Sequence, residues 1–355
     1  MPIVPLYGHH LLRLRLAESA QRGALPSSLL IEGAPGIGKQ RLALWLGQML
    51  LCTGQGTRPC GECSDCRLSA ELAHPDLRWF FPRPRLEGNV TPREALDDYA
   101  EAIEDRVKSG GLYPRPSGSD GIFISAVLGL IHIAARTPAL AARKVLVVGE
   151  AERMVSQEGA DEAANAFLKL LEEPPLNTTI VLTSSEPGAL LPTIRSRVTS
   201  VRAAPLPAAD MGAFLGDRTV EQTLNDDTHV PASFQERIAL ASGAPGTLIG
   251  RAAIENALAI ARSMLAAATA GRAESARAAL SLKVNKARGE FSDVLDALTI
   301  LLGERMRDAA FCADSAAALA ANRAIDSVEQ AKLRAAGNVS PQLLGASLLR
   351  ELLRP

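Results

Sequence analysis

The chain has 355 residues, which is more than one ordinary hydrophobic core holds and predicts two or three domains. Lysine and arginine total 38 and aspartate and glutamate total 39, and this balance argues against a protein whose whole surface binds nucleic acid. Aromatic residues make up only 4% of the chain, too few for an extended platform that stacks single-stranded bases.

Membrane insertion and secretion are not expected. The longest nearly apolar run, Ile122 to Ala135, spans 14 residues, whereas a membrane-spanning helix needs about 20. We interpret the run as a buried helix. The first residues lack the apolar region and cleavage site of a secretory signal, so we expect a cytoplasmic protein.

The first 50 residues predict the start of an α/β nucleotide-binding unit. Apolar residues at helical spacing predict a helix over His10–Ala20, and a short buried strand follows at Ser28–Glu32. A glycine-rich segment and then an apolar helix come next. Strand, glycine loop and helix in this order are typical of folds that bind nucleotides.

The glycine-rich segment GAPGIGKQ matches the phosphate-binding pattern G-x-x-x-x-G-K, with candidate nucleotide-binding residues Gly33, Gly36, Gly38 and Lys39. Glycines let backbone amides surround phosphate oxygens, and a lysine neutralises the terminal phosphates. Gln40 stands where a working loop has the Ser or Thr that binds Mg²⁺. Two interpretations stay open: a loop that binds phosphate without productive magnesium, and a structural relic.

Four of the five cysteines lie close together and predict a metal site: Cys52, Cys60, Cys63 and Cys66. Four thiolates complete a tetrahedral Zn²⁺ shell, and two-residue spacings let neighbouring cysteines bind one ion. We expect a closed, structural site; free surface thiols are the alternative. We expect Cys312, alone in a helix, to be part of the core.

From about residue 82 to 120 the chain is rich in proline, with a charged helical piece over Arg93–Lys108. We interpret this stretch as an insertion, either a partner-binding loop or a tolerated addition without a role. The segment KVLVV then predicts a strand inside a parallel sheet. Gly149 follows it where a magnesium-binding acid is expected. The next residue, Glu150, has the right chemistry to orient water but lacks a metal, so ATP hydrolysis is not expected.

A helix through NAFLKLLEE ends before Pro174-Pro175, and TTIVLTSS predicts another strand, which together favour a doubly wound sheet. The following TIRSRV segment contains Arg195 and Arg197. They are either solvated surface groups, or one of them is an arginine finger that reaches the γ-phosphate of a nucleotide on a neighbouring chain. Beyond about residue 206 the chain predicts helices only. One apolar face runs through Val294, Leu295, Leu298, Leu301 and Leu302, and another through Leu344, Leu348 and Leu352.

Several of these motifs together resemble the bacterial clamp-loader subunits of the AAA+ class. They are GAPGIGK, the four cysteines, HPD at 74–76, NAFLKLLEEPP at 165–175 and the Ser196-Arg197 step, in the family's order between about residues 6 and 205. The family's Ser-Arg-Cys motif has lost its cysteine here, and the segment 243–247 lacks the nucleotide-sensing arginine of motor subunits. A defective loop beside an intact Arg197 resembles the stator type of subunit.

The resemblance implies an α/β P-loop AAA+ domain, a parallel sheet with helices on both faces, over 1–205, with a zinc module at about 50–70 and the insertion at about 82–120. A small helical lid domain at 206–252 and an all-α collar domain at 253–355 would follow.

It also implies partners: motor (gamma/tau) and delta subunits, and, through the assembled complex, a sliding clamp and primed DNA. Arg197 would act in trans on a neighbour's ATP. The implied cofactor is structural Zn²⁺, and ATP binding stays open. The alternatives are an active clamp-loader ATPase and a zinc-dependent DNA-binding protein.

Overall fold

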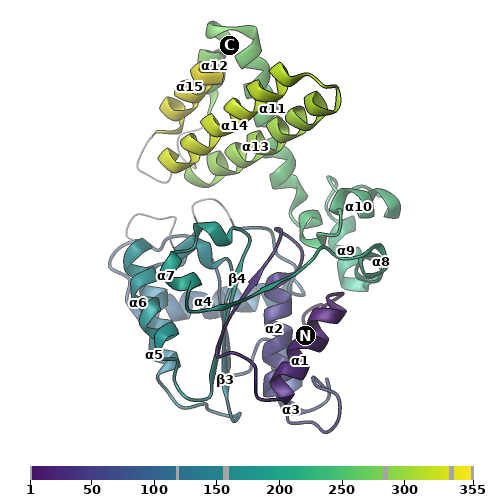
Figure 1. Cartoon of the computed structure of the whole chain (residues 1–355), viewed down its shortest axis with the longest axis vertical. Helices are drawn as coiled ribbons and strands as arrows, with labels where there is room; N and C mark the ends of the chain where they lie inside the picture. Colours follow the sequence, from purple (N-terminus) through teal and green to yellow (C-terminus); the bar gives the residue numbers. More distant parts are fainter. Residues whose placement is uncertain (1, 117–119, 155–159, 283–286, 336–339, 353–355) are drawn as a thin grey trace. The chain divides into compact units, whose positions relative to one another are not determined.

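The computed structural model describes residues 2–116, 120–154, 160–282, 287–335 and 340–352. The chain divides into two compact units (Figure 1). The first is formed by Met1–Arg115 with Gly121–Gly250, and the second by Pro116–Asp120 with Arg251–Pro355. None of the described helices combines the length and the apolar character that crossing a membrane requires.

A five-stranded parallel sheet forms the centre of the first unit. Its strands are β1 (Ser28–Glu32), β2 (Leu77–Phe80), β3 (Lys144–Val148), β4 (Thr178–Ser184) and β5 (Thr199–Arg202). Their order is β2-β3-β4-β1-β5, and every neighbouring pair is parallel. Every residue of β3 and β4 is buried, as expected for strands inside a parallel sheet; the apolar run KVLVV predicted this for β3.

Two of these strands, β2 and β5, were not predicted from the sequence. Each has four residues, too few to establish a periodic pattern. The strand β5 lies at the edge of the sheet and is largely exposed, so its sequence TSVR carries no apolar run. The strand β2 is defined by its pairing with β3, and β5 by its pairing with β1. Both pairings form between residues that are distant in the sequence.

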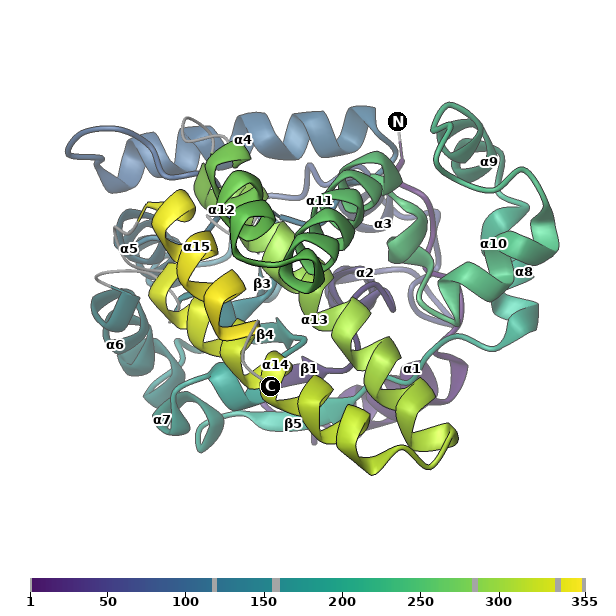
Figure 2. The ribbon, with the colours of Figure 1, turned by 90° about the horizontal axis from the view of Figure 1, so that it is seen from above.

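Helices cover both faces of the sheet, as expected for this fold class. In Figures 1 and 2, α1 and α2 lie on one face and α5, α6 and α7 on the other. The apolar core between them is continuous and includes fully buried side chains of β1, β3 and β4. The helices of this part are α1 (His10–Gln21), α2 (Lys39–Leu51), α3 (Ser64–Ala70), α4 (Pro92–Lys108), α5 (Ile124–Ala134), α6 (Ala160–Glu172) and α7 (Pro192–Arg195), with short 3₁₀ turns at Ala151–Met154 and Pro187–Ala189.

The predicted helical piece of the insertion is α4. Thr91 caps its N-terminus, accepting a hydrogen bond from the Glu94 backbone amide while the Glu94 carboxylate accepts one from the Thr91 amide. One face of α4 enters the main core through the buried side chain of Tyr99, whose hydroxyl donates to the Phe81 carbonyl at 2.6 Å. The insertion is therefore an integral part of the first unit.

The rest of the first unit is a small helical cluster with its own apolar core. It contains α8 (Ala208–Leu215), α9 (Arg218–Asn225), α10 (Phe234–Ala241) and a 3₁₀ turn at Pro245–Leu248. Phe214, Val220, Leu224 and Leu248 are buried in this core together with Val4 from the start of the chain.

Among the described residues of the second unit, the regular structure is helical: α11 (Arg251–Ala270), α12 (Arg272–Ser281), α13 (Ala287–Phe311), α14 (Ser315–Ala335) and α15 (Pro341–Leu352). The two apolar faces predicted from the sequence meet in its core, where Leu295, Leu298 and Leu348 are buried. The prediction for Cys312 was wrong: this residue follows the end of α13 and is exposed, because the helix ends one residue before it.

Candidate functional site

The glycine-rich loop joins β1 to α2, at the carboxyl end of the sheet where α/β folds bind ligands. Gly36 and Gly38 have φ angles of 78° and 91°, which other residues rarely adopt. A Cβ atom on Gly33 would lie 2.5 Å from the Ala203 carbonyl oxygen. The structure therefore brings the candidate nucleotide-binding residues together as a phosphate-type loop.

Lys39 is folded back into this loop. Its ammonium group donates to the carbonyl oxygens of Gly33 and Ala34, at 2.9 and 2.8 Å, and to the Ser185 hydroxyl at 2.9 Å. The side chain is only 6% exposed. Burial lowers the pKa of Lys39 to about 8, although Glu152 and Glu150 favour its charged form. Internal acceptors therefore already satisfy the charge that would meet a phosphate.

Gln40 fills the place where a magnesium shell would be built. Its Oε1 accepts a hydrogen bond from the Trp79 indole at 2.9 Å, and its Nε2 donates to Glu150 at 3.4 Å. A Cβ atom on Gly149 would lie 2.1 Å from that Oε1. The Gln40 amide thus rests directly on Gly149. The two departures from the magnesium-binding pattern, far apart in the sequence, are therefore in contact in the structure.

Glu150 is bonded to residues of the chain itself. Its carboxylate pairs with Arg153 at 3.1 Å and accepts from Gln40, and its backbone amide donates to the Thr183 hydroxyl. Each carboxylate oxygen of Glu150 therefore has a partner within the chain.

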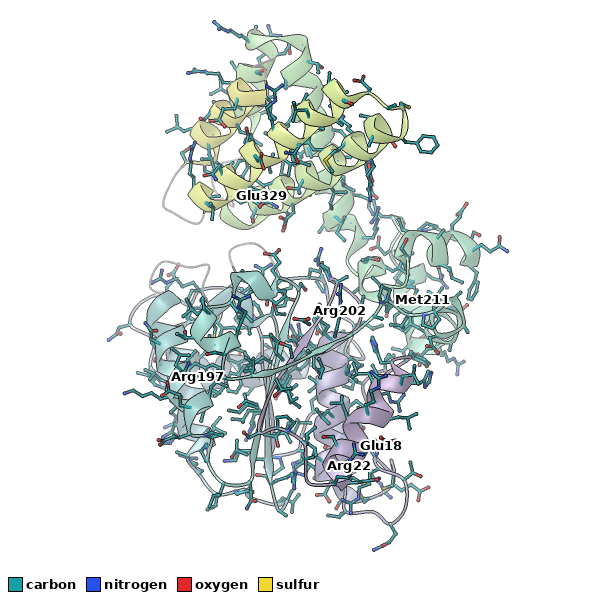
Figure 3. All side chains as sticks on the ribbon, in the orientation of Figure 1. Glu18, Arg22, Arg197, Arg202, Met211 and Glu329 are labelled. Atoms are coloured by element: carbon teal, nitrogen blue, oxygen red, sulfur yellow. The ribbon has the colours of Figure 1, made fainter. Side chains whose placement is uncertain are left out.

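Arg197 lies just beyond α7, on the side of the sheet covered by α6 and opposite the helix that carries Glu18 and Arg22 (Figure 3). Its guanidinium donates to Glu172 at 2.6 Å and to the Thr193 carbonyl oxygen at 2.9 Å. Of its hydrogen bonds in the described part of the chain, none goes to the glycine loop. Arg197 is therefore a partly exposed arginine that is bonded to Glu172 and does not contact the glycine loop of its own chain.

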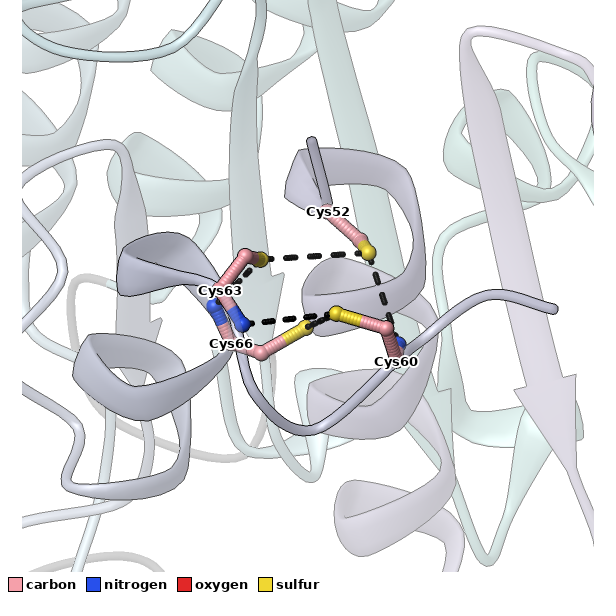
Figure 4. A group of neighbouring side chains, drawn as sticks. All are labelled: Cys52, Cys60, Cys63 and Cys66. Carbon is pink, nitrogen blue, oxygen red and sulfur yellow. Dashed lines mark hydrogen bonds between the residues drawn. The ribbon is translucent and has the colours of Figure 1, made fainter. Parts of the chain in front are cut away.

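The four cysteines form a compact cluster between α2 and α3 (Figure 4). Their sulfur atoms all lie within 4.8 Å of one another, and the Cys60–Cys66 and Cys52–Cys63 pairs are each 3.9 Å apart. Four sulfurs placed ~2.3 Å from one zinc ion would be ~3.8 Å apart, so the arrangement fits a tetrahedral metal ion.

Backbone amides point to three of the four sulfurs, whereas burial raises the pKa of the Cys66 thiol. The amides of Cys60, Cys63 and Cys66 each point to the sulfur of an earlier cysteine at 3.4 Å. Burial opposes the charged form of Cys63, but hydrogen bonds from the Cys66 and Thr53 backbone outweigh it and lower the pKa of Cys63 to about 6. The cluster also requires a glycine at position 54, because a Cβ there would lie 2.4 Å from the Cys60 sulfur. The sequence did not reveal this requirement.

A buried polar chain connects this cluster to the sheet. Asp65 accepts from the Thr53 hydroxyl at 2.5 Å and pairs with His74 at 3.2 Å. Asp76 accepts from three consecutive backbone amides, Ala139 to Ala141, just before β3. His74 has a partner that the sequence could not identify. The HPD motif therefore has a structural role that fixes the cysteine cluster against the sheet.

Comparison with known proteins identifies the family. A family model described as DNA polymerase III, delta subunit, matches residues 9–207, more than half of the chain. The chain belongs to this family. The clamp-loader resemblance read from the motifs is thereby confirmed.

Curated relatives of this family member include DNA polymerase III subunit delta' of Escherichia coli, 29% identical over 236 residues, and that of Pseudomonas aeruginosa, 33% identical over 220 residues. The first match covers 66% of this chain and 57% of the relative, the second 61% and 53%. The chain therefore spans little more than half of either relative. DNA polymerase III subunit gamma/tau of Mycobacterium bovis is 29% identical over 208 residues, which cover 58% of this chain and 29% of the relative.

Proposed function

We propose that this chain is the stator (delta prime) subunit of a bacterial DNA polymerase III clamp loader. In this role it turns over no ATP itself. It supplies Arg197 to the ATP site of a neighbouring motor subunit and supports the loading of a sliding clamp onto primed DNA. The proposed partners are the motor (gamma/tau) and delta subunits.

The observation that carries the proposal is the contrast between the two candidate sites of this family member. In the chain's own glycine loop, the Lys39 ammonium group donates hydrogen bonds to three oxygen atoms of the same chain, and the Gln40 amide packs on Gly149. Arg197 also has internal partners, Glu172 among them, but unlike Lys39 its side chain is partly exposed and can be reached by another chain. A planar guanidinium contacts two phosphate oxygens at once, which suits it to act on a nucleotide held by another chain.

The remaining parts have supporting roles in this proposal. The four-cysteine cluster would bind one Zn²⁺ ion that stabilises the segment between α2 and β2, since structural zinc contributes folding energy directly. The helical cluster at 206–252 would be the counterpart of a nucleotide lid. The helices of 253–355 would join a collar of subunits.

The test compares two neighbouring arginines in the complex reconstituted with the cognate motor and delta subunits, the clamp and primed DNA. Arg197→Ala is expected to slow ATP turnover and clamp loading. An arginine finger is worth about 10³-fold or more at its own site, but other subunits complete the other sites, so the loss should be partial. Arg195→Ala is the matched control, because Arg195 is exposed in the same segment.

The outcome that contradicts the proposal is a complex with Arg197→Ala that assembles and loads clamps as fast as the complex with Arg195→Ala. Assembly is checked separately by gel filtration, so that failure to assemble is not counted as failure to catalyse. Glu172→Gln is a further useful variant, because it weakens the ion pair and leaves Arg197 in place.

The alternative of an active ATPase subunit is opposed by the contact between Gln40 and Gly149. It predicts ATP turnover by the isolated chain that Lys39→Ala abolishes, whereas the stator proposal predicts no turnover above background. The alternative of a zinc-dependent DNA-binding protein is opposed by the net charge of −1 and predicts a salt-dependent DNA affinity of the isolated chain.

A further inference from the structure

The insertion ends in a segment that packs against the nucleotide side of the fold. We call Ser109–Arg115, the residues that follow α4, the strap. The Gly110 carbonyl oxygen accepts a hydrogen bond from the Val4 amide at 2.7 Å and one from the Arg41 guanidinium at 3.4 Å. A Cβ on Gly111 would lie 2.8 Å from that guanidinium and 3.0 Å from the Cβ of Ile3.

Arg41 places the strap beside the glycine loop. It lies two residues after Lys39, in the first turn of the helix whose N-terminus would hold phosphate. The strap therefore lies against the start of α2 and the N-terminal segment of the chain. Arg115, the last residue of the strap, lies close enough to Lys39 for the two positive charges to repel each other.

Tyr113 extends this contact to the carboxyl end of the sheet. Its ring lies 5.5 Å from that of Trp79 in β2, and the Arg106 guanidinium stacks 3.6 Å from the Tyr113 ring centre. Trp79 in turn donates to Gln40. A chain of contacts thus runs from the strap to the residue that fills the magnesium position, at the edge of the sheet where α/β folds take ligands.

The strap also contacts both apolar cores of the first unit. Tyr113 packs against the main core, and Leu112 packs against the core of the helical cluster. Pro114 lies against Gly250, where a Cβ would be 2.6 Å from the proline side chain. Near it, Gly246 donates to the Gly36 carbonyl oxygen at 2.8 Å, so the turn at Pro245–Leu248 rests on the loop itself.

We propose that the strap is a built-in cover of the nucleotide site, which keeps ATP from the loop and joins the α/β core to the helical cluster without a nucleotide. This assigns a role within the chain to the end of the insertion. The inference goes beyond the proposed stator function and does not depend on Arg197 or on assembly, so either can fail while the other stands.

The test loosens the strap with Gly111→Ala and uses Gly88→Ala as its matched control. Both glycines lie in the insertion with similar φ angles, 74° and 81°, so both substitutions introduce similar backbone strain. A Cβ on Gly88 meets nothing within 4 Å, whereas one on Gly111 pushes against Arg41 and Ile3. Only Gly111→Ala should therefore displace the strap.

Binding of a fluorescent ATP analogue to the full chain is measured by anisotropy, with Mg²⁺ and with chelator. We expect no binding to the wild type or to Gly88→Ala, and binding to Gly111→Ala that is lost in Gly111→Ala/Lys39→Ala. A ~10-fold rise in the open fraction tightens the apparent affinity ~10-fold, because only open molecules bind. Hydrogen exchange should also quicken in the strap and at residues 3–4.

Two results would overturn the proposal. One is a wild-type chain that binds the analogue as tightly as Gly111→Ala does. The other is a folded Gly111→Ala protein with faster exchange in the strap that still binds nothing. If Gly111→Ala fails to fold, Tyr113→Ala serves as the second variant, since it removes the aromatic contacts without backbone strain, and the same two results decide.

Discussion

Gln40 and Gly149 form a contact whose energy can be measured with a double-mutant cycle. The perturbation is Gly149→Ala, which places a Cβ 2.1 Å from the Gln40 Oε1. Gly149 is buried and its φ angle is not positive. The new methyl group therefore destabilises the protein through its clash with Gln40 and adds no backbone strain.

The expected magnitude follows from what must move. Inserting a group into a packed site costs about 1–3 kcal/mol. If the Gln40 amide moves away instead, the Trp79 indole loses its acceptor, which costs a similar ~1–3 kcal/mol. We therefore expect Gly149→Ala to lower the free energy of unfolding by ~2 kcal/mol in the wild-type background. In a Gln40→Ala background the same change should cost less than ~0.5 kcal/mol.

Tryptophan fluorescence during urea unfolding is a suitable assay. The chain has two tryptophans, Trp45 and Trp79, and both lie in the first unit, so the signal reports on that unit. Gly188→Ala is the control, since a Cβ there meets nothing within 4 Å. Equal costs of Gly149→Ala with and without Gln40 would refute the reasoning. A coupled pair would mean that restoring a magnesium site requires both positions to change together.

Two further predictions concern the metal centre and the loop lysine. Elemental analysis should find one zinc ion per chain. Gly54→Ala, which crowds the Cys60 sulfur, should weaken metal binding at least ~10-fold, whereas the control Gly188→Ala should not. Zinc-free protein of unchanged thermal stability would contradict this. The pKa of Lys39 is lowered from 10.5 to about 8 in the folded state, so between these values the unfolded chain binds more protons and the free energy of unfolding rises with pH. That rise amounts to ~3 kcal/mol and should be absent in Lys39→Met, compared by urea unfolding at pH 7 and near pH 10; equal pH slopes for both proteins would count against it.

The local features of the first unit could be predicted from the sequence because they depend on short-range patterns. Short runs of apolar and β-branched residues predicted β1, β3 and β4, since strands buried on both faces are rich in such residues. The cysteine spacing predicted the cluster, because ligands two residues apart reach one ion through a tight turn. The order of motifs along the chain was also enough to recognise the family.

Tertiary structure decided what depends on contacts between distant residues. The strands β2 and β5 are defined by pairing, and His74 acquires Asp65 as a partner only after folding. Gln40 and Gly149 are 109 positions apart in the sequence, so only the folded chain shows that one fills the space left by the other. The same holds for the strap: its sequence gives a proline- and glycine-rich segment, and its position beside α2 results from packing against residues at both ends of the first unit.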